Sequence, residues 1–219
     1  MKKILISMLA TLFFVATAHA EKRIGISAAH TSFSSEGTET VKSSAQKNRK
    51  THDDDVVVPS IFVEYVNDNG LAIGLDFIPV GAELGSATNA RTDTDTDDAS
   101  DTAGNNNVSA ELSMHATLYL LLEADNGFYL KGGIARATID TTENLATGTT
   151  YGNEDVHGVM IGAGLSKDTA NGIFVRSEVT YTDYEEATFQ GSLDSDSARN
   201  KIDGDVDALA IRFSIGKKF

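Results

Sequence analysis

One stretch decides the fold of this chain: residues 205–219 read DVDALAIRFSIGKKF. Every second residue from Leu209 to Ile215 is apolar, and Phe219 ends the same row after a single lysine. The residues between them, from Ala208 to Gly216, are small or charged. A period of two is typical of a β-strand with one apolar face and one small or polar face.

The first twenty residues have the three parts of a secretory signal. A lysine pair is followed by an apolar run over Ile4–Ala16 and by the small-x-small site Ala18-His19-Ala20. A retained helical anchor is the alternative, but the run is too short to cross a hydrocarbon core of about 30 Å comfortably. We therefore expect residues 1–20 to be a cleavable Sec signal and residues 21–219 to form one domain.

The composition of the mature chain excludes several classes of protein. Two lysines leave with the signal, which lowers the basic count from 18 to 16 against 32 acidic residues. So acidic a chain argues against a basic face for nucleic acid. The absence of cysteine excludes a disulfide framework. No mature segment approaches the roughly 18 consecutive apolar residues of a membrane-spanning helix.

Three Asn-Gly dipeptides, at 69–70, 126–127 and 171–172, divide the chain into hairpins. Asn-Gly is the strongest short-range signal for a tight turn because both residues tolerate positive φ. The flanking alternation predicts eight strands: Arg23–Phe33, Val56–Val66, Leu71–Val80, Val108–Ala124, Phe128–Thr142, Val156–Lys167, Ile173–Phe189 and Asp205–Phe219. Four polar stretches are predicted to be loops: Ser34–Asp55, Gly81–Asn107, Glu143–Asp155 and Gln190–Gly204.

The connections alternate long and short along the chain, which places every tight turn at one end of the sheet. This arrangement is typical of bacterial transmembrane barrels and has no reason to occur in a soluble sandwich. We therefore predict an all-β fold: an eight-stranded antiparallel up-and-down transmembrane β-barrel with short periplasmic turns, long extracellular loops and both termini periplasmic. Ile134 shares its phase with Arg136, so we expect a bulge in this strand or its early exit from the lipid band.

The whole mature chain resembles the small eight-stranded outer-membrane barrels, the family that contains the OmpA transmembrane domain, OmpX and the opacity-type surface proteins. The resemblance lies in the signal, the three Asn-Gly turns and the residues 208–219. It implies a location in the bacterial outer membrane among lipid and lipopolysaccharide. It also implies a C-terminal signal for the barrel assembly machinery, carried here by Ile211, Phe213, Ile215 and Phe219.

The phase opposite the apolar rows gathers charged residues that should point into the lumen. Side chains roughly fill the interior of an eight-stranded barrel, and buried charges must be paired. We therefore expect a structural ion network that plugs the lumen, with a narrow gated conductance as the alternative. Its predicted members are Glu64, Asp76, Glu111, His115, Glu123, Lys131, Arg176, Glu178 and Arg212.

Two polar stretches are candidate ligand sites. The run Thr92–Asp98 offers alternating aspartates, but Asp98 stands where a calcium loop has glycine, so a solvated acidic loop is the preferred interpretation. Whether the Asp-rich loop 92–101 binds calcium stays open. Lys42, Lys47, Arg49 and Lys50 could contact lipopolysaccharide phosphates, but a polar loop is preferred here too.

His30 and Ser32 suggest an enzyme hypothesis, because some eight-stranded barrels are lipid A deacylases with a histidine base and a serine nucleophile. No orienting acid is assigned to the pair, and no nucleophile elbow, zinc motif or phosphate-binding loop occurs. We therefore predict no enzyme activity, no cofactor and no metal. The predicted role is structural or interactive, in envelope integrity or adhesion, with the loop ligand and oligomeric state open.

Overall fold

The computed structural model describes residues 21–41, 46–91, 104–145, 150–192 and 201–219. The predicted signal and the acidic run Thr92–Asp98 lie outside these residues. The described part contains β1 (Glu21–Val41), β2 (Gln46–Val66), β3 (Leu71–Ile78), β4 (Ala82–Arg91), β5 (Gly104–Glu123), β6 (Phe128–Asn144), β7 (Glu154–Asp168), the 3₁₀ turn η1 (Ala170–Gly172), β8 (Ile173–Tyr184), β9 (Ala187–Gln190) and β10 (Lys201–Lys218). None of its helical residues forms a segment long and apolar enough to span a membrane.

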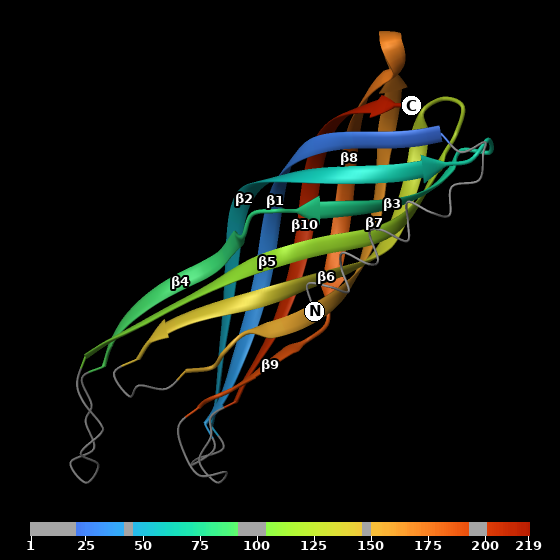
Figure 1. The fold of residues 1–219 in the computed structure, drawn as a ribbon. Coiled ribbons are helices and arrows are strands. Elements are labelled where there is room, and N and C mark those ends of the chain that lie inside the picture. Colours follow the sequence, from blue (N-terminus) through green and yellow to red (C-terminus); the bar gives the residue numbers. More distant parts are fainter. Residues whose placement is uncertain (1–20, 42–45, 92–103, 146–149, 193–200) are drawn as a thin grey trace, which may run out of the picture.

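The strands form one antiparallel sheet that closes on itself (Figure 1). The order is β1-β2-β3-β5-β6-β7-β8-β10, and β10 then pairs with β1 along Arg23–Thr40. β4 continues the line of β3 beside β5, and β9 continues the line of β8 beside β10. The wall therefore has eight strand positions in sequence order, which confirms the predicted eight-stranded up-and-down barrel.

The three Asn-Gly dipeptides form the tight turns, all at one end of the barrel. Gly70, Gly127 and Gly172 have positive φ of 75°, 83° and 73°. In the third turn Asn171 is also left-handed, at φ 64°. An added Cβ on Gly70 would lie 2.3 Å from the carbonyl oxygen of Glu123. Glycine is thus required there by both conformation and space.

Two of the four polar stretches predicted to be loops, Ser34–Asp55 and Gly81–Asn107, are in large part strand, so that part of the prediction is wrong. β1 and β2 stay paired out to Val41 and Gln46, and β4 lies within the predicted loop Gly81–Asn107. A ladder needs only backbone donors and acceptors, so it continues where the apolar alternation has ended. Cross-strand pairs such as the Ser34 hydroxyl donating to Asp53 at 2.8 Å support the polar part.

A β-bulge lies in β5 and not in β6. Between the pairs Ser113–Thr138 and Ala116–Arg136, β5 has two residues against one on β6, and Met114 takes a φ of 51°. β6 itself is regular. Its outward phase passes from Ile134 to Arg136, which pairs with Asp155 at 2.7 Å. The strand therefore leaves the apolar band early, the second of the two predicted outcomes.

An apolar band surrounds the outside of the barrel. On β10 it consists of the predicted row Leu209, Ile211, Phe213 and Ile215, each about half exposed or more. The same band crosses the other strands through Ile26, Ile61, Ile73, Leu120, Leu130, Ile161 and Val179. So continuous an exposed apolar surface is typical of a protein surrounded by lipid.

Candidate functional site: an ion-paired layer in the lumen

Two aromatic rings that pack against glycines form one part of the site. The Phe62 ring covers Gly25, and the Phe174 ring covers Gly216, where an added Cβ would be 2.3 Å and 2.4 Å from the respective ring carbons. The two rings meet at a centroid distance of 6.2 Å. Glycine lets each ring lie against the neighbouring strand, which leaves room in the lumen for long charged side chains.

Glu64 and Arg176 form the central pair of the layer. Arg176 donates from both terminal nitrogens to the two carboxylate oxygens of Glu64, at 2.6 Å and 2.9 Å. The Tyr119 hydroxyl adds a hydrogen bond of 2.8 Å to Glu64. Arg176 also lies over the Phe174 ring, 4.7 Å from its centroid. The Glu64 side chain is fully buried, so this charge is held by its partners alone.

Two further pairs adjoin the central one. Arg212 donates to Asp76 at 2.6 Å, and the Ser60 hydroxyl donates to the same carboxylate at 2.8 Å. Lys131 donates to Glu178 at 3.2 Å, and Glu178 also accepts from the Tyr129 hydroxyl at 3.0 Å. Arg212 approaches Glu178 at 3.7 Å, which links the pairs into one network.

Arg23 and Glu123 close the layer toward the tight turns. Arg23 donates to Glu123 at 2.6 Å, and Arg176 lies 3.8 Å from the same carboxylate. Inside the lumen the network contains four cations and four carboxylates: Arg23, Lys131, Arg176 and Arg212 with Glu64, Asp76, Glu123 and Glu178. At the rim, Arg23 also pairs with the partly exposed Glu21 at 2.5 Å. Because the charges balance and are paired at hydrogen-bond distance, the layer satisfies the requirement for charge in a low-dielectric interior. We call it the ion layer.

The lumen beyond the ion layer, toward the long connections, is mostly apolar, with Thr31, Thr182 and His115 among its buried polar side chains. A single buried cluster fills it, with members on every side of the wall: Ala29, Phe33, Val58, Ala82, Leu84, Leu112, Ala135, Ala137, Ile139, Val156, Tyr184, Ala187, Phe189, Val206, Ala208 and Ala210. The sequence pattern predicts a polar lumen that is plugged by an ion network. Only the half near the tight turns is charged, and we call the other half the apolar compartment.

Eight of the nine predicted network residues point into the lumen, and seven of them belong to the ion layer. His115 is buried but makes an edge contact with Tyr184 at 6.2 Å, and neither of its ring nitrogens has a hydrogen-bond partner among the described residues. Glu111 is exposed on the outside. It was assigned to the wrong phase because the bulge at Met114 reverses the alternation.

Four participants in the layer were not predicted: Arg23, Ser60, Tyr119 and Tyr129. Arg23 could have been found, because it shares the inward phase of Gly25 and Ser27 opposite Ile24 and Ile26. The three hydroxyl donors carry no charge, so a search of the inward phase for charged residues does not select them. Their role depends on which carboxylate lies across the barrel, which alternation does not encode.

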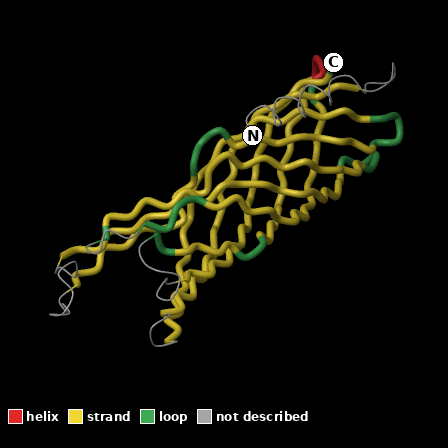
Figure 2. The backbone as a smooth tube through the Cα atoms, turned by 60° about the horizontal axis from the view of Figure 1, so that its bottom comes forward, coloured by secondary structure: helices red, strands yellow, loops and turns green. Residues whose placement is uncertain are grey.

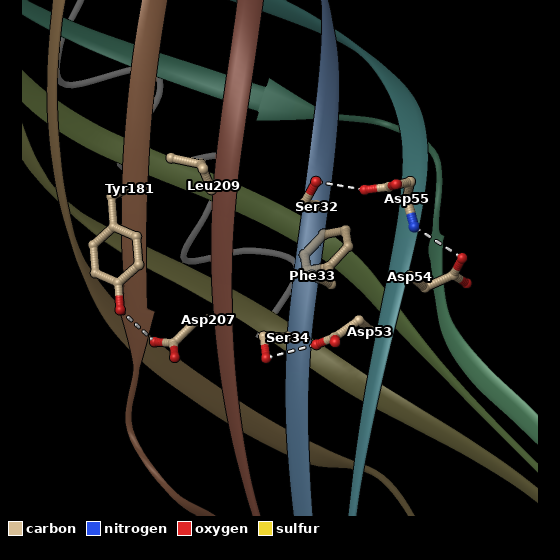
Figure 3. Close-up of a pocket in the computed structure, with 9 residues that line it drawn as sticks. All are labelled: Ser32, Phe33, Ser34, Asp53, Asp54, Asp55, Tyr181, Asp207 and Leu209. Carbon is tan, nitrogen blue, oxygen red and sulfur yellow. Dashed lines mark hydrogen bonds between the residues drawn. The ribbon is translucent and has the colours of Figure 1, made fainter.

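The pair His30 and Ser32 lies on the outside of β1 and not in the lumen. Figure 3 shows Ser32 hydrogen-bonded to Asp55, Ser34 to Asp53 and Tyr181 to Asp207 in a shallow hollow at the edge of the apolar band. In this structure the Ser32 hydroxyl donates to the Asp55 carboxylate.

No protein-family model matches this chain, and no curated protein matches it. Solved structures do. OprG of Pseudomonas aeruginosa is 14% identical with a TM-score of 0.55, over 92% of this chain and 96% of that one. AlkL, solved in lipid bilayers, is 11% identical with a TM-score of 0.53, over 94% and 92%. The outer membrane protease OmpT of Escherichia coli is 9% identical with a TM-score of 0.50, over 93% and 99%.

At these identities the likeness concerns the fold alone. The closed antiparallel sheet, the apolar outer band and these neighbours together define the class: the chain has the fold of the outer-membrane β-barrel proteins. The ion layer then specifies a barrel whose interior is occupied by side chains at the level of the band.

Proposed function

We propose that this chain is a bacterial outer-membrane protein of the small eight-stranded group that includes the OmpA transmembrane domain, OmpX and the opacity-type proteins. Its role is structural or surface-interactive, in envelope integrity or adhesion, and it is not an enzyme. One observation supports this most: the ion layer closes the lumen near the tight turns, while the wall continues as polar sheet beyond the apolar band. Lipid and lipopolysaccharide are then its immediate surroundings.

The polar extensions are the surface available to a partner. β1 and β2 remain paired for nine residues beyond Ser32–Asp55, which corresponds to about 30 Å of strand. Their outward side chains include the pair Arg49–Glu36 and the exposed Lys47. A rigid sheet that presents charged and hydroxyl side chains suits recognition at a cell surface better than transport through the wall.

The proposal predicts that the purified protein in planar bilayers gives no stable conductance steps, because paired charges and rings occupy the lumen. A matched variant should differ: Glu64→Ala/Phe174→Ala/Arg176→Ala removes the central pair and the ring beside it. Single-channel recording of both proteins, with insertion checked by heat-modifiable gel migration, makes the comparison. Stable large-conductance steps from the unaltered protein would contradict a plugged lumen.

We further propose that the outward row Ile211, Phe213, Ile215 and Phe219 serves as a signal for the barrel assembly machinery. The Phe219 ring is 70% exposed, with the Lys217 ammonium 5.4 Å from its centroid, whereas its backbone N–H donates to the Lys22 carbonyl at 2.9 Å. Phe219→Ala is therefore expected to reduce the yield of inserted barrel in cells while leaving the urea midpoint of the purified protein unchanged. A normal yield would argue against the signal.

A further inference from the structure

An open hollow lies at the end of the barrel that carries the tight turns. Figure 2 shows this end beside the C-terminus, with the turn η1 in red. The hollow has a volume of about 580 Å³. The pair Arg23–Glu123 of the ion layer forms its floor, and its wall comes from the start of β1, the end of β7 and the turns β2–β3 and β5–β6. The proposed membrane placement, on which only this orientation rests, turns the hollow toward the periplasm.

Backbone hydrogen bonds hold the two turns of this wall in place. The N–H of Glu123 donates to the Gly70 carbonyl at 2.9 Å, and the N–H of Ser166 donates to the Gly127 carbonyl at 2.7 Å. Each of these Asn-Gly turns is therefore tied to the next strand of the wall. The side chains that line the hollow are carried by a fixed backbone frame, which a binding site needs in order to hold its groups in position.

Ser166 places a buried hydroxyl in this wall. It is the last buried residue of β7, with 9% of its surface exposed, and it lines the hollow. Its hydroxyl oxygen makes no hydrogen bond among the residues that the structure describes. The large majority of buried side-chain polar atoms have a partner, because a buried polar atom without one costs free energy. The Ser166 hydroxyl therefore points to a ligand that brings a hydrogen-bonding group into the hollow.

The charge of the hollow selects a cation. The carboxylates that line it are Glu21, Asp68, Glu123, Asp125 and Asp168. Two lining cations, Arg23 and Lys167, oppose them, and Lys218 of β10 donates to Asp168 at 2.7 Å. Five negative charges thus face three positive ones. Removal of the predicted signal adds an α-ammonium at Glu21 and still leaves one carboxylate in excess. Asp68 and Asp125, both exposed on turns, take part in no ion pair within the described part of the chain.

We propose that this hollow binds a linear aliphatic polyamine, with one ammonium group at the Ser166 hydroxyl and others at the turn aspartates. An ammonium group has hydrogen-bond donors only, which suits a hydroxyl oxygen and carboxylates. Asp68 and Asp125 lie on turns two strand spacings apart, about 10 Å, so ammonium groups separated by several methylenes can reach both. Val66 and Ala124 line the hollow and offer apolar surface to the methylenes. A metal ion fits less well, because no group of three possible ligands gathers within the described ranges.

Calorimetric titration of the refolded protein with spermidine, in micelles of an uncharged detergent and at low ionic strength, tests the site. We expect saturable binding of one spermidine per barrel. Ser166→Ala should weaken the affinity about tenfold or more, the effect of losing a hydrogen bond to a charged group. Its urea midpoint should stay the same or rise, because the variant removes a buried hydroxyl that has no partner. A hydroxyl with a structural role would lower that midpoint instead.

Two double variants separate the site from net charge. Asp68→Asn/Asp125→Asn, at exposed turn positions that do not endanger folding, should weaken spermidine binding about three- to tenfold. Asp183→Asn/Asp205→Asn makes the same charge change at exposed positions toward the other end of the barrel and should leave the affinity unchanged. No saturable binding, an unchanged affinity after Ser166→Ala or in the turn variant, an equal loss in both double variants, or equally tight binding of Mg²⁺ would each overturn the site. The proposed function would remain intact in all of these cases.

Discussion

Arg176→Met is expected to lower the free energy of unfolding by about 3–5 kcal/mol, the cost of breaking a buried ion pair from one side. The substitution leaves the fully buried carboxylate of Glu64 without its bidentate partner at 2.6 Å and 2.9 Å. Only the Tyr119 hydroxyl remains on that carboxylate. The methionine fills most of the volume, so the loss is electrostatic more than steric.

Urea unfolding of the protein refolded in detergent micelles measures the effect. The double variant Glu64→Gln/Arg176→Met should recover a large part of the loss, because no uncompensated charge remains. The matched control is Arg136→Met, which breaks the exposed pair with Asp155 and should cost at most about 1 kcal/mol. Equal losses at Arg136 and Arg176 would mean that the lumen is hydrated and the ion layer does not close it.

Most of the ion layer could be predicted because alternate residues of a strand in a barrel wall point into the lumen and away from it. Glu64, Asp76 and Arg176 lie on phases opposite long apolar rows, and nothing between them and the nearest turn disturbs the alternation. The prediction that Glu111 points into the lumen was wrong because a single extra residue at the bulge reverses the alternation. The left-handed φ of Met114 at this bulge is not signalled by its residue type. Phase predictions therefore hold from each tight turn only as far as the first irregularity.

The features that escaped prediction depend on which residues face one another across the sheet. Tyr119 is visible in the sequence, but its hydrogen bond to Glu64 follows only from the positions of β5 and β2 around the lumen. The extension of the strands beyond the band escaped for a different reason. Backbone pairing there needs no apolar alternation, so residues such as Thr38 and Arg49 pair within stretches that read as polar loop.

Phe213→Arg is expected to destabilise the barrel by about 2–4 kcal/mol in phospholipid vesicles, the cost of a lipid-facing arginine near the bilayer midplane. Phe213 is 65% exposed and lies near the middle of its row, which has the polar residues Asp207 and Lys217 at its two ends. The same change at an exposed position of a protein in water would usually stay within about 0.5 kcal/mol. The size of the destabilisation therefore shows whether lipid or water surrounds this face of β10.

The matched control is Thr51→Arg, which introduces the same side chain at an exposed position of β2, outside the apolar band and beyond Asp53–Asp55. Urea titrations of both variants in vesicles, followed by heat-modifiable gel migration, should show a large shift for Phe213→Arg and almost none for Thr51→Arg. The size of the shift should follow the depth of the residue in the bilayer. The shift of Ile211→Arg should therefore be closer to that of Phe213→Arg than to that of Thr51→Arg. Equally small shifts at all three positions would mean that the apolar band faces water or another protein surface, and the membrane placement would then be wrong.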